Sequence, residues 1–384
     1  MSMYHFPVKI ISADGCLKEL GNEIKKIGAK YPLIITDPGI VAAGIAEKVV
    51  MPLKEKGIRY NIFDHAEPDP KLRDVISVVE VARKEKNDLL IGLGGGSSID
   101  TTKAASILSV NDFDLRQYQG FQEAYPRTPL PIFTVPTTAG TGSEISAAAM
   151  IVDEEKDFKM IIKSPQIFPK IALLDCDVLV GIPNHIAAAT GADTLSHAIE
   201  SFFSPNRSFM TEAASLNAIS LVFKNLRPFV ANTKNRERAQ NMMNASCLAG
   251  IGMTTAGLGL IHGLAHPLGI KGRISHGLAC ALFLPHVLRF NWIADPDQFI
   301  RLYHVLEWAI GREYHGEREM ALKVIEEVQN LLTDIGLPSR LSETGISVKE
   351  SEMIVEEACS SYLNQVNPRP ASRKQMEDIL NMIL

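Results

Sequence analysis

The stretch LLIGLGGGSSIDTTKAASI, residues 89–107, decides the fold of the first half of the chain. Its apolar run at 89–93 predicts a buried strand, and the pattern from about Ser97 onward predicts a helix. Three glycines join them, and they let the backbone turn tightly and bring its N–H groups against a ligand at the helix N-terminus. The stretch therefore predicts either a cradle for a diphosphate or a tight strand-to-helix turn without a ligand.

The surrounding sequence repeats this alternation of strands and helices. Short β-branched runs predict parallel strands, and stretches with apolar residues at helical spacing predict the crossover helices between them. The clearest runs are at 31–36, 58–63 and 130–138, and the clearest helical stretches are at 44–57 and 71–87. The first half is therefore expected to be an α/β domain with a doubly wound sheet.

The second half has a different periodicity. After residue 182 the strand-like runs stop, and long segments rich in Ala, Leu and Met predict helices, for example at 211–226 and 319–332. A Gly and Pro pair at 181–183 precedes the first of these helices. We therefore expect two domains, an α/β domain over residues 1–182 and an all-helical domain over residues 183–384.

Composition excludes several classes of protein. The 384 residues are 46% hydrophobic and 22% charged, with a net charge of −5 that leaves no basic surface for nucleic acid. No apolar run approaches the ~18 residues of a membrane span, and the N-terminus lacks the core of a signal peptide, so a cytoplasmic protein without a membrane partner is expected. The five cysteines lie far apart without a C-x-x-C pair, which argues against a cysteine metal site and indicates reduced structural thiols.

A second glycine-rich loop supports a nucleotide site. VPTTAGTGSE, residues 135–144, also follows a predicted strand, and ligands of open α/β sheets bind at the carboxyl ends of strands. Asp37 follows a third strand, where its carboxylate could accept hydrogen bonds from a ribose and repel a 2′-phosphate, which favours NAD over NADP. Asp37 can equally be a turn or helix-cap residue. The G-x-G-x-x-G fingerprint is absent, so these loops alone do not establish a dinucleotide site.

The helical half contains candidate metal ligands. Asp193 and His197 in GADTLSHAIESF lie four residues apart and share one face of the predicted helix. His262 and His266 repeat that spacing, and His276 follows closely. Carboxylate and imidazole suit a divalent transition metal. These are five candidates for a set that usually has four ligands, with His286 as a weaker sixth, and their spacing does not choose among them.

Four motifs in this order resemble the iron-containing (group III) alcohol dehydrogenases. They are GGGSSID, VPTTAGTGSE, GADTLSHAIE and GLGLIHGLAHPLGIKGRISHG, and the similarity extends to NPRPASRKQ near the C-terminus. The resemblance implies a fold shared with glycerol dehydrogenases and dehydroquinate synthases, with an N-terminal dinucleotide-binding domain and a helical metal-binding domain.

The resemblance also assigns roles to residues. It implies the metal ligands Asp193, His197, His262 and His276, and it leaves His266 unligated beside the nicotinamide, where it could relay the alcohol proton. Asp37 would hold the adenosine ribose. The residues that would frame the diphosphate are Gly94, Gly95, Gly96, Ser97 and Asp100. Thr137 and Thr138 would contact the cofactor. The cofactor cleft would be lined by Lys159, with Lys163 as the alternative, and by Leu179.

The implied activity is a metal-dependent alcohol dehydrogenase or aldehyde reductase. Hydride would pass between NAD(H) and a small alcohol or aldehyde, while the metal polarises the substrate oxygen. The resemblance favours Fe²⁺ over Zn²⁺, although an Asp and three His suit both, and it implies a homodimer. The alternative is a dehydroquinate synthase-like or glycerol dehydrogenase-like enzyme on the same architecture.

Overall fold

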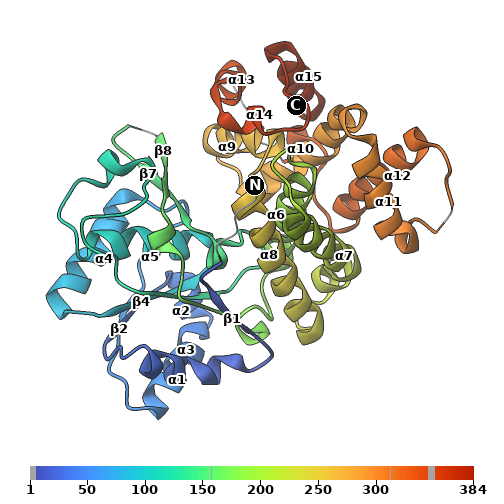
Figure 1. Cartoon of the computed structure of the whole chain (residues 1–384). Helices are drawn as coiled ribbons and strands as arrows, with labels where there is room; N and C mark the ends of the chain where they lie inside the picture. The colour runs from blue at the N-terminus through green and yellow to red at the C-terminus, as the bar shows by residue number, and fades with distance from the viewer. Residues whose placement is uncertain (1–5, 157, 312, 345–350) are drawn as a thin grey trace. The chain divides into compact units, whose positions relative to one another are not determined.

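A computed structural model describes residues 6–156, 158–311, 313–344 and 351–384. The chain divides into two compact units, which meet in the sequence between Val180 and Gly181 (Figure 1). The predicted domain boundary lies two residues further along the chain.

The N-terminal unit is built on a six-stranded sheet in the order β1-β9-β6-β4-β2-β3, and all its neighbouring strands pair parallel. Its strands are β1 (Lys9–Ser12), β2 (Pro32–Ile35), β3 (Asn61–Phe63), β4 (Leu89–Gly94), β6 (Ile132–Pro136) and β9 (Ile171–Leu174). Every residue of β2, β4, β6 and β9 is buried, as expected for parallel strands covered on both faces. The predicted α/β class is confirmed.

Helices connect these strands. They are α1 (Leu20–Lys26), α2 (Pro38–Ala42), α3 (Ile45–Glu55), α4 (Leu72–Glu85) and α5 (Gly96–Leu108). In α4 the residues Val75, Val78, Val79 and Ala82 are buried, which is the i, i+3, i+4, i+7 face of an amphipathic helix. The strand predicted at 58–63 is reduced to the three residues of β3, which lies at the edge of the sheet and, among the described residues, pairs only with β2.

A second, three-stranded sheet was not predicted. It contains β5 (Gly120–Phe121), β7 (Ala148–Asp153) and β8 (Phe158–Lys163), and β7 pairs antiparallel with β8. Along β8, Met160 and Ile162 are buried whereas Phe158, Ile161 and Lys163 are exposed. A strand with one buried face is typical of antiparallel sheets, and this alternation distinguishes β8 from the fully buried strands of the main sheet.

In the C-terminal unit, all regular elements of the described residues are helices, as predicted. They are α6 (Asn184–Phe203), α7 (Phe209–Ala231), α8 (Arg236–Ala256), α9 (Leu260–Gly272), α10 (His276–Asn291), α11 (Pro296–Ile310), α12 (Glu317–Asp334), α13 (Ser351–Ser360), α14 (Tyr362–Gln365) and α15 (Arg373–Ile383), with short 3₁₀ turns between some of them. Gly277 permits a close approach of α10 to α6, because a Cβ there would lie 2.1 Å from the Ala189 carbonyl oxygen.

One described segment, His276–Ala294, has the length and apolar composition of a membrane span, which differs from the expectation that no such run exists. Its most apolar stretch is 56% buried inside the structure. Core helices of soluble proteins pass the same test, so this segment is weak evidence for a membrane contact.

Candidate metal centre and cofactor cradle

Three helices of the C-terminal unit each contribute two side chains that lie four residues apart, one helical turn. α6 carries Asp193 and His197, α9 carries His262 and His266, and α10 begins with His276 and carries Cys280. Residues at this spacing share a helix face. The packing of the helices brings the faces together, since the His262 ring centroid lies 4.6 Å from that of His197 and 5.2 Å from that of His276.

Three of the four predicted metal ligands, the histidines, face one carboxylate oxygen of the fourth. Asp193 Oδ1 lies 3.8 Å from Nε2 of His197, 3.8 Å from Nε2 of His262 and 3.5 Å from Nε2 of His276. This oxygen is buried and accepts no hydrogen bond within the described part of the chain. A buried carboxylate oxygen without a donor is costly, and a cation among these nitrogens would compensate for that cost. The donor set therefore fits a divalent transition metal.

Glu200 orients one of the histidines. Its Oε2 lies 2.6 Å from Nδ1 of His262, and its Oε1 accepts a hydrogen bond of 2.6 Å from the Ile261 N–H. Nδ1 therefore carries the proton in our assignment, and the Nε2 lone pair faces Asp193. Burial lowers the pKa of His262 well below its usual value and raises the pKa of Glu200 to about 7. The His262 ring thus stays neutral, which is the form that binds metals.

Replacing Glu200 with Ala is expected to lower metal affinity by roughly 10- to 100-fold, the usual effect of losing a partner that orients a ligand. Gln keeps a carbonyl acceptor for the Nδ1–H, so Glu200→Gln should fall between Ala and the wild type. Competition against a chelator measures the three affinities, and Glu326→Ala on the exposed side of α12 serves as the control. Equal affinities for the wild type and Glu200→Ala would show that His262 is held by other contacts.

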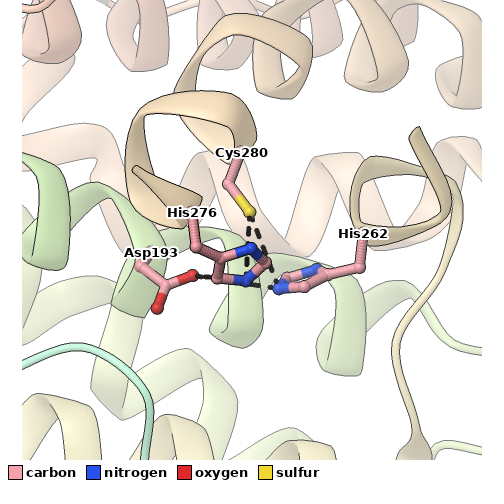
Figure 2. A group of neighbouring side chains, drawn as sticks. All are labelled: Asp193, His262, His276 and Cys280. Atoms are coloured by element: carbon pink, nitrogen blue, oxygen red, sulfur yellow. Dashed lines mark hydrogen bonds and ion pairs between the residues drawn. The ribbon is translucent and has the colours of Figure 1, made fainter. Parts of the chain in front are cut away.

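Cys280 and Glu200 were not predicted as part of the site. Cys280 Sγ lies 3.7 Å from Nε2 of both His262 and His276, and Figure 2 shows the thiol beside these rings and Asp193. Burial raises the pKa of this thiol well above its usual value. Each residue shares a helix face with a predicted ligand, Glu200 seven residues after Asp193 and Cys280 four after His276, and that spacing was the signal in the sequence.

His266 lies beside this cluster rather than on Asp193. Its ring centroid is 5.7 Å from that of His262 and 5.2 Å from that of His276, and its side chain is only half-buried. This position is compatible with the expectation that His266 stays unligated and handles a proton.

In the N-terminal unit, the two glycine-rich loops lie against each other. The Thr137 N–H donates a 3.0 Å hydrogen bond to the Gly94 carbonyl oxygen. A Cβ on Gly95 would lie 3.4 Å from Thr138 Oγ1, and a Cβ on Gly96 would lie 2.8 Å from Thr141 Cγ2. The loops follow the neighbouring parallel strands β4 and β6, so they form one surface at the carboxyl ends of these strands, the usual ligand position in α/β sheets.

Asp37 is a helix-cap residue whose carboxylate also borders the glycine-rich surface. Its Oδ1 caps α2 by accepting a 3.0 Å hydrogen bond from the Ile40 N–H. Its Oδ2 lies 3.6 Å from the place of a Cβ on Gly94, so the carboxylate borders the glycine-rich surface. The helix cap therefore fixes a carboxylate beside the glycine-rich surface.

Asp100 holds the two loops together from inside the fold. Its carboxylate accepts hydrogen bonds from the Ser143 hydroxyl at 2.5 Å and from the Met150 N–H at 2.9 Å. Lys103, one turn further along α5, donates to Ser143 Oγ at 2.8 Å, and burial lowers the pKa of this lysine to about 8. Asp100 thus frames the cradle through Ser143.

The remaining predicted cofactor residues lie as follows. Ser97 is half-buried in the first turn of α5, which begins at Gly96, one residue earlier than expected. Lys159 Nζ lies 3.5 Å from Asp69 Oδ1, and Lys163 is exposed at the end of β8. Leu179 is 1% exposed.

Comparison with known families agrees with this geometry. The family model described as iron-containing alcohol dehydrogenase matches residues 7–176, and the model described as the C-terminal part of the Fe-containing alcohol dehydrogenase family matches residues 187–384. Together the matches cover both units.

Individual relatives are similar over their full length. The chain is 32% identical to the NAD-dependent methanol dehydrogenase of Bacillus methanolicus over 100% of both chains. A 1,3-propanediol oxidoreductase structure has a TM-score of 0.95 at 32% identity, also over 100% of both chains. The sulfoacetaldehyde reductase of Bifidobacterium kashiwanohense, solved in complex with NAD⁺, has a TM-score of 0.89 at 26% identity over 100% of this chain and 98% of that one. These relatives fit the predicted alcohol dehydrogenase and not the synthase-like or glycerol dehydrogenase-like alternative. The chain therefore belongs to the iron-containing alcohol dehydrogenase family, which confirms the enzyme class and the pair of NAD and a divalent metal predicted from its sequence.

Proposed function

We propose that this protein transfers a hydride between NAD(H) and a small alcohol or aldehyde, at a divalent metal held by Asp193, His197, His262 and His276. The observation that carries the proposal is the buried Asp193 Oδ1, which accepts no hydrogen bond among the described residues although three Nε2 atoms lie within 3.8 Å of it. In a member of this family, that arrangement is best explained by a catalytic cation, with Fe²⁺ favoured over Zn²⁺.

The residues of the cluster determine what such a cation can do. When bound, a divalent metal supplies a Lewis acid that stabilises the substrate oxygen as an alkoxide or polarises a carbonyl. Asp193 contributes one negative charge and the neutral histidines none, so these four residues would leave a divalent ion with one net positive charge. Glu200 holds His262 with its lone pair toward the site. We expect His266, which is half-buried, to take up the alcohol proton and pass it to solvent.

The test is a comparison of metal-free and metal-loaded protein. Anaerobic protein loaded with Fe²⁺ or Zn²⁺ should reduce NAD⁺ with short alcohols or diols and oxidise NADH with aldehydes, and the metal-free protein should not. Net NADH formation separates this activity from a dehydroquinate synthase type of reaction, which regenerates its NAD. Full turnover by metal-free protein would overturn the proposal.

The cofactor would lie on the glycine-rich surface of the N-terminal unit. The diphosphate would contact the N-terminus of α5 at Gly94, Gly95, Gly96 and Ser97. Thr137 and Thr138 would contact the cofactor from the second loop, and Asp37 would hold the adenosine ribose. Asp100 supports the loops, and we keep Lys159 and Leu179 as residues that line the remainder of the cofactor site.

Replacing Asp37 with Asn is expected to raise kcat/KM for NADP⁺ by roughly tenfold, the ratio that about 1.4 kcal/mol of relieved charge repulsion produces. Asn also caps helices well, so α2 should remain intact. Steady-state kinetics with NAD⁺ and NADP⁺ measure the ratio. Asp88→Asn is the control, because Asp88 also accepts hydrogen bonds from backbone N–H groups, those of Lys30 and Tyr31. An unchanged preference would remove Asp37 from the ribose site.

We also propose a cytoplasmic homodimer that has no nucleic-acid or membrane partner, with functional domains at residues 1–182 and 183–384. The net charge of −5 supports the absence of a nucleic-acid surface. Sedimentation of the purified protein tests the oligomeric state, and a monomer at all concentrations would contradict it.

A further inference from the structure

We propose that Cys280 is a further ligand of the metal, binding it through Sγ as a thiolate in the substrate-free protein. This inference rests on the proposed metal site and adds a sulfur donor to it. Figure 2 shows the thiol pointing to the same point as the Asp193 carboxylate and the rings of His262 and His276. The donor atoms of these four residues all lie within 4.8 Å of one another.

The separations between the donor atoms match those of ligands around one ion. For bonds of about 2.1 Å to nitrogen or oxygen and about 2.3 Å to sulfur, at the angles of roughly 90–120° found with four or five ligands, neighbouring donors lie roughly 3 to 4 Å apart. Cys280 Sγ is 3.7 Å from Nε2 of both His262 and His276. Asp193 Oδ1 is 3.5 Å from Nε2 of His276 and 3.8 Å from Nε2 of His262.

A second observation independently points to a ligand at this place. Asp193 has a relative exposure of only 3%, and its Oδ1 has no hydrogen-bond donor within the described residues. The Cys280 thiol therefore lies beside a buried carboxylate oxygen that lacks a compensating charge. Cys280 itself is fully buried, one helical turn after His276. Gly277 allows that turn of α10 to lie close to Asp193 on α6, because a Cβ there would lie 3.3 Å from Asp193 Cβ.

The chemistry requires no oxidant. The thiol S–H bond breaks, the proton leaves to solvent, and the sulfur lone pair forms the bond to the divalent ion. With His197, the site then offers five donors. A soft sulfur donor favours Zn²⁺ and Co²⁺ over Mg²⁺ and Mn²⁺, so Cys280 should increase the selectivity of the site for thiophilic metals.

The experiment is cobalt titration of the full-length, metal-stripped protein, read by absorption and not by activity. The wild type is expected to show visible d–d bands and a near-ultraviolet thiolate-to-cobalt charge-transfer band. Cys280→Ser and Cys280→Ala should keep the d–d bands and lose the charge-transfer band, and their affinity for Zn²⁺ relative to Mn²⁺ should fall by roughly tenfold. Cys176→Ala is the matched control, because Cys176 is also a buried thiol near carboxylates, those of Asp14 and Asp175.

The outcomes separate this inference from the proposed function. Visible cobalt bands without a charge-transfer band in the wild type, or a charge-transfer band that persists in Cys280→Ser, would overturn the sulfur ligand and leave the metal site in place. Failure of the wild type to bind cobalt or any other divalent metal would overturn both. If a Cys280 variant does not fold, Cys176→Ala decides the question, because a charge-transfer band that disappears in Cys176→Ala would assign the sulfur to Cys176 and overturn the inference.

Discussion

Purified His262→Ala protein is expected to contain almost no metal and to show no measurable turnover. The substitution removes one of the nitrogens that face Asp193 Oδ1 and leaves the fully buried Glu200 carboxylate without its Nδ1–H partner. Losing a partner that only orients a ligand costs 10- to 100-fold in metal affinity, so losing the ligand itself should cost more than about 100-fold. Metal analysis and NAD(H)-linked assays of the same preparation measure both effects.

His304→Ala is the matched control for this variant. His304 lies on α11 of the same unit, and its side chain is 54% exposed beside Glu307. Its replacement should leave metal content and turnover at the wild-type level. If His262→Ala keeps metal but loses turnover, His262 acts on the substrate instead of the metal, and if it keeps both, the proposed site is wrong.

Replacing Gly94 with Ala is expected to weaken NADH binding by more than about 100-fold. Gly94 has a φ of 151°, a conformation that L residues rarely adopt, and its new Cβ would lie 2.4 Å from Ser98 Oγ and 2.7 Å from Ser98 Cβ. Ser98 is part of α5, so relief of the clash must move the helix N-terminus away from β4. The backbone N–H groups that would contact the diphosphate move with it. Titration of NADH fluorescence measures the affinity.

Gly120→Ala separates the clash from the backbone strain. Gly120 also has a positive φ, 88°, but a Cβ there meets no atom within 4 Å. This variant should lose about 1 kcal/mol of stability or somewhat more and keep its NADH affinity. The metal content of both variants should be unchanged, since the proposed ligands belong to the other unit. Normal NADH affinity in Gly94→Ala would place the diphosphate elsewhere.

The sequence by itself determined the class of both halves. Fully buried apolar runs such as β4 are typical of parallel sheets, and long amphipathic segments predict helices, so periodicity was sufficient for an α/β half and a helical half. Helical spacing placed Asp193 and His197 on one face before any tertiary information. The order of the four motifs was sufficient for the family, because their residue types and spacing are specific.

Only the tertiary structure decided which faces meet. Spacing along one helix says which side chains share a face, but the partner of that face depends on packing between helices that are distant in sequence, such as α6 and α10 at Gly277. For this reason the sequence alone predicts Cys280 as a structural thiol, and it does not show that Asp100 acts on the second loop through Ser143. The position of Cys280 beside Asp193 depends on a contact over 87 residues, and that of Asp100 beside Ser143 on a contact over 43 residues. Local periodicity carries no information about such contacts, which are set by close packing of side chains in the folded core.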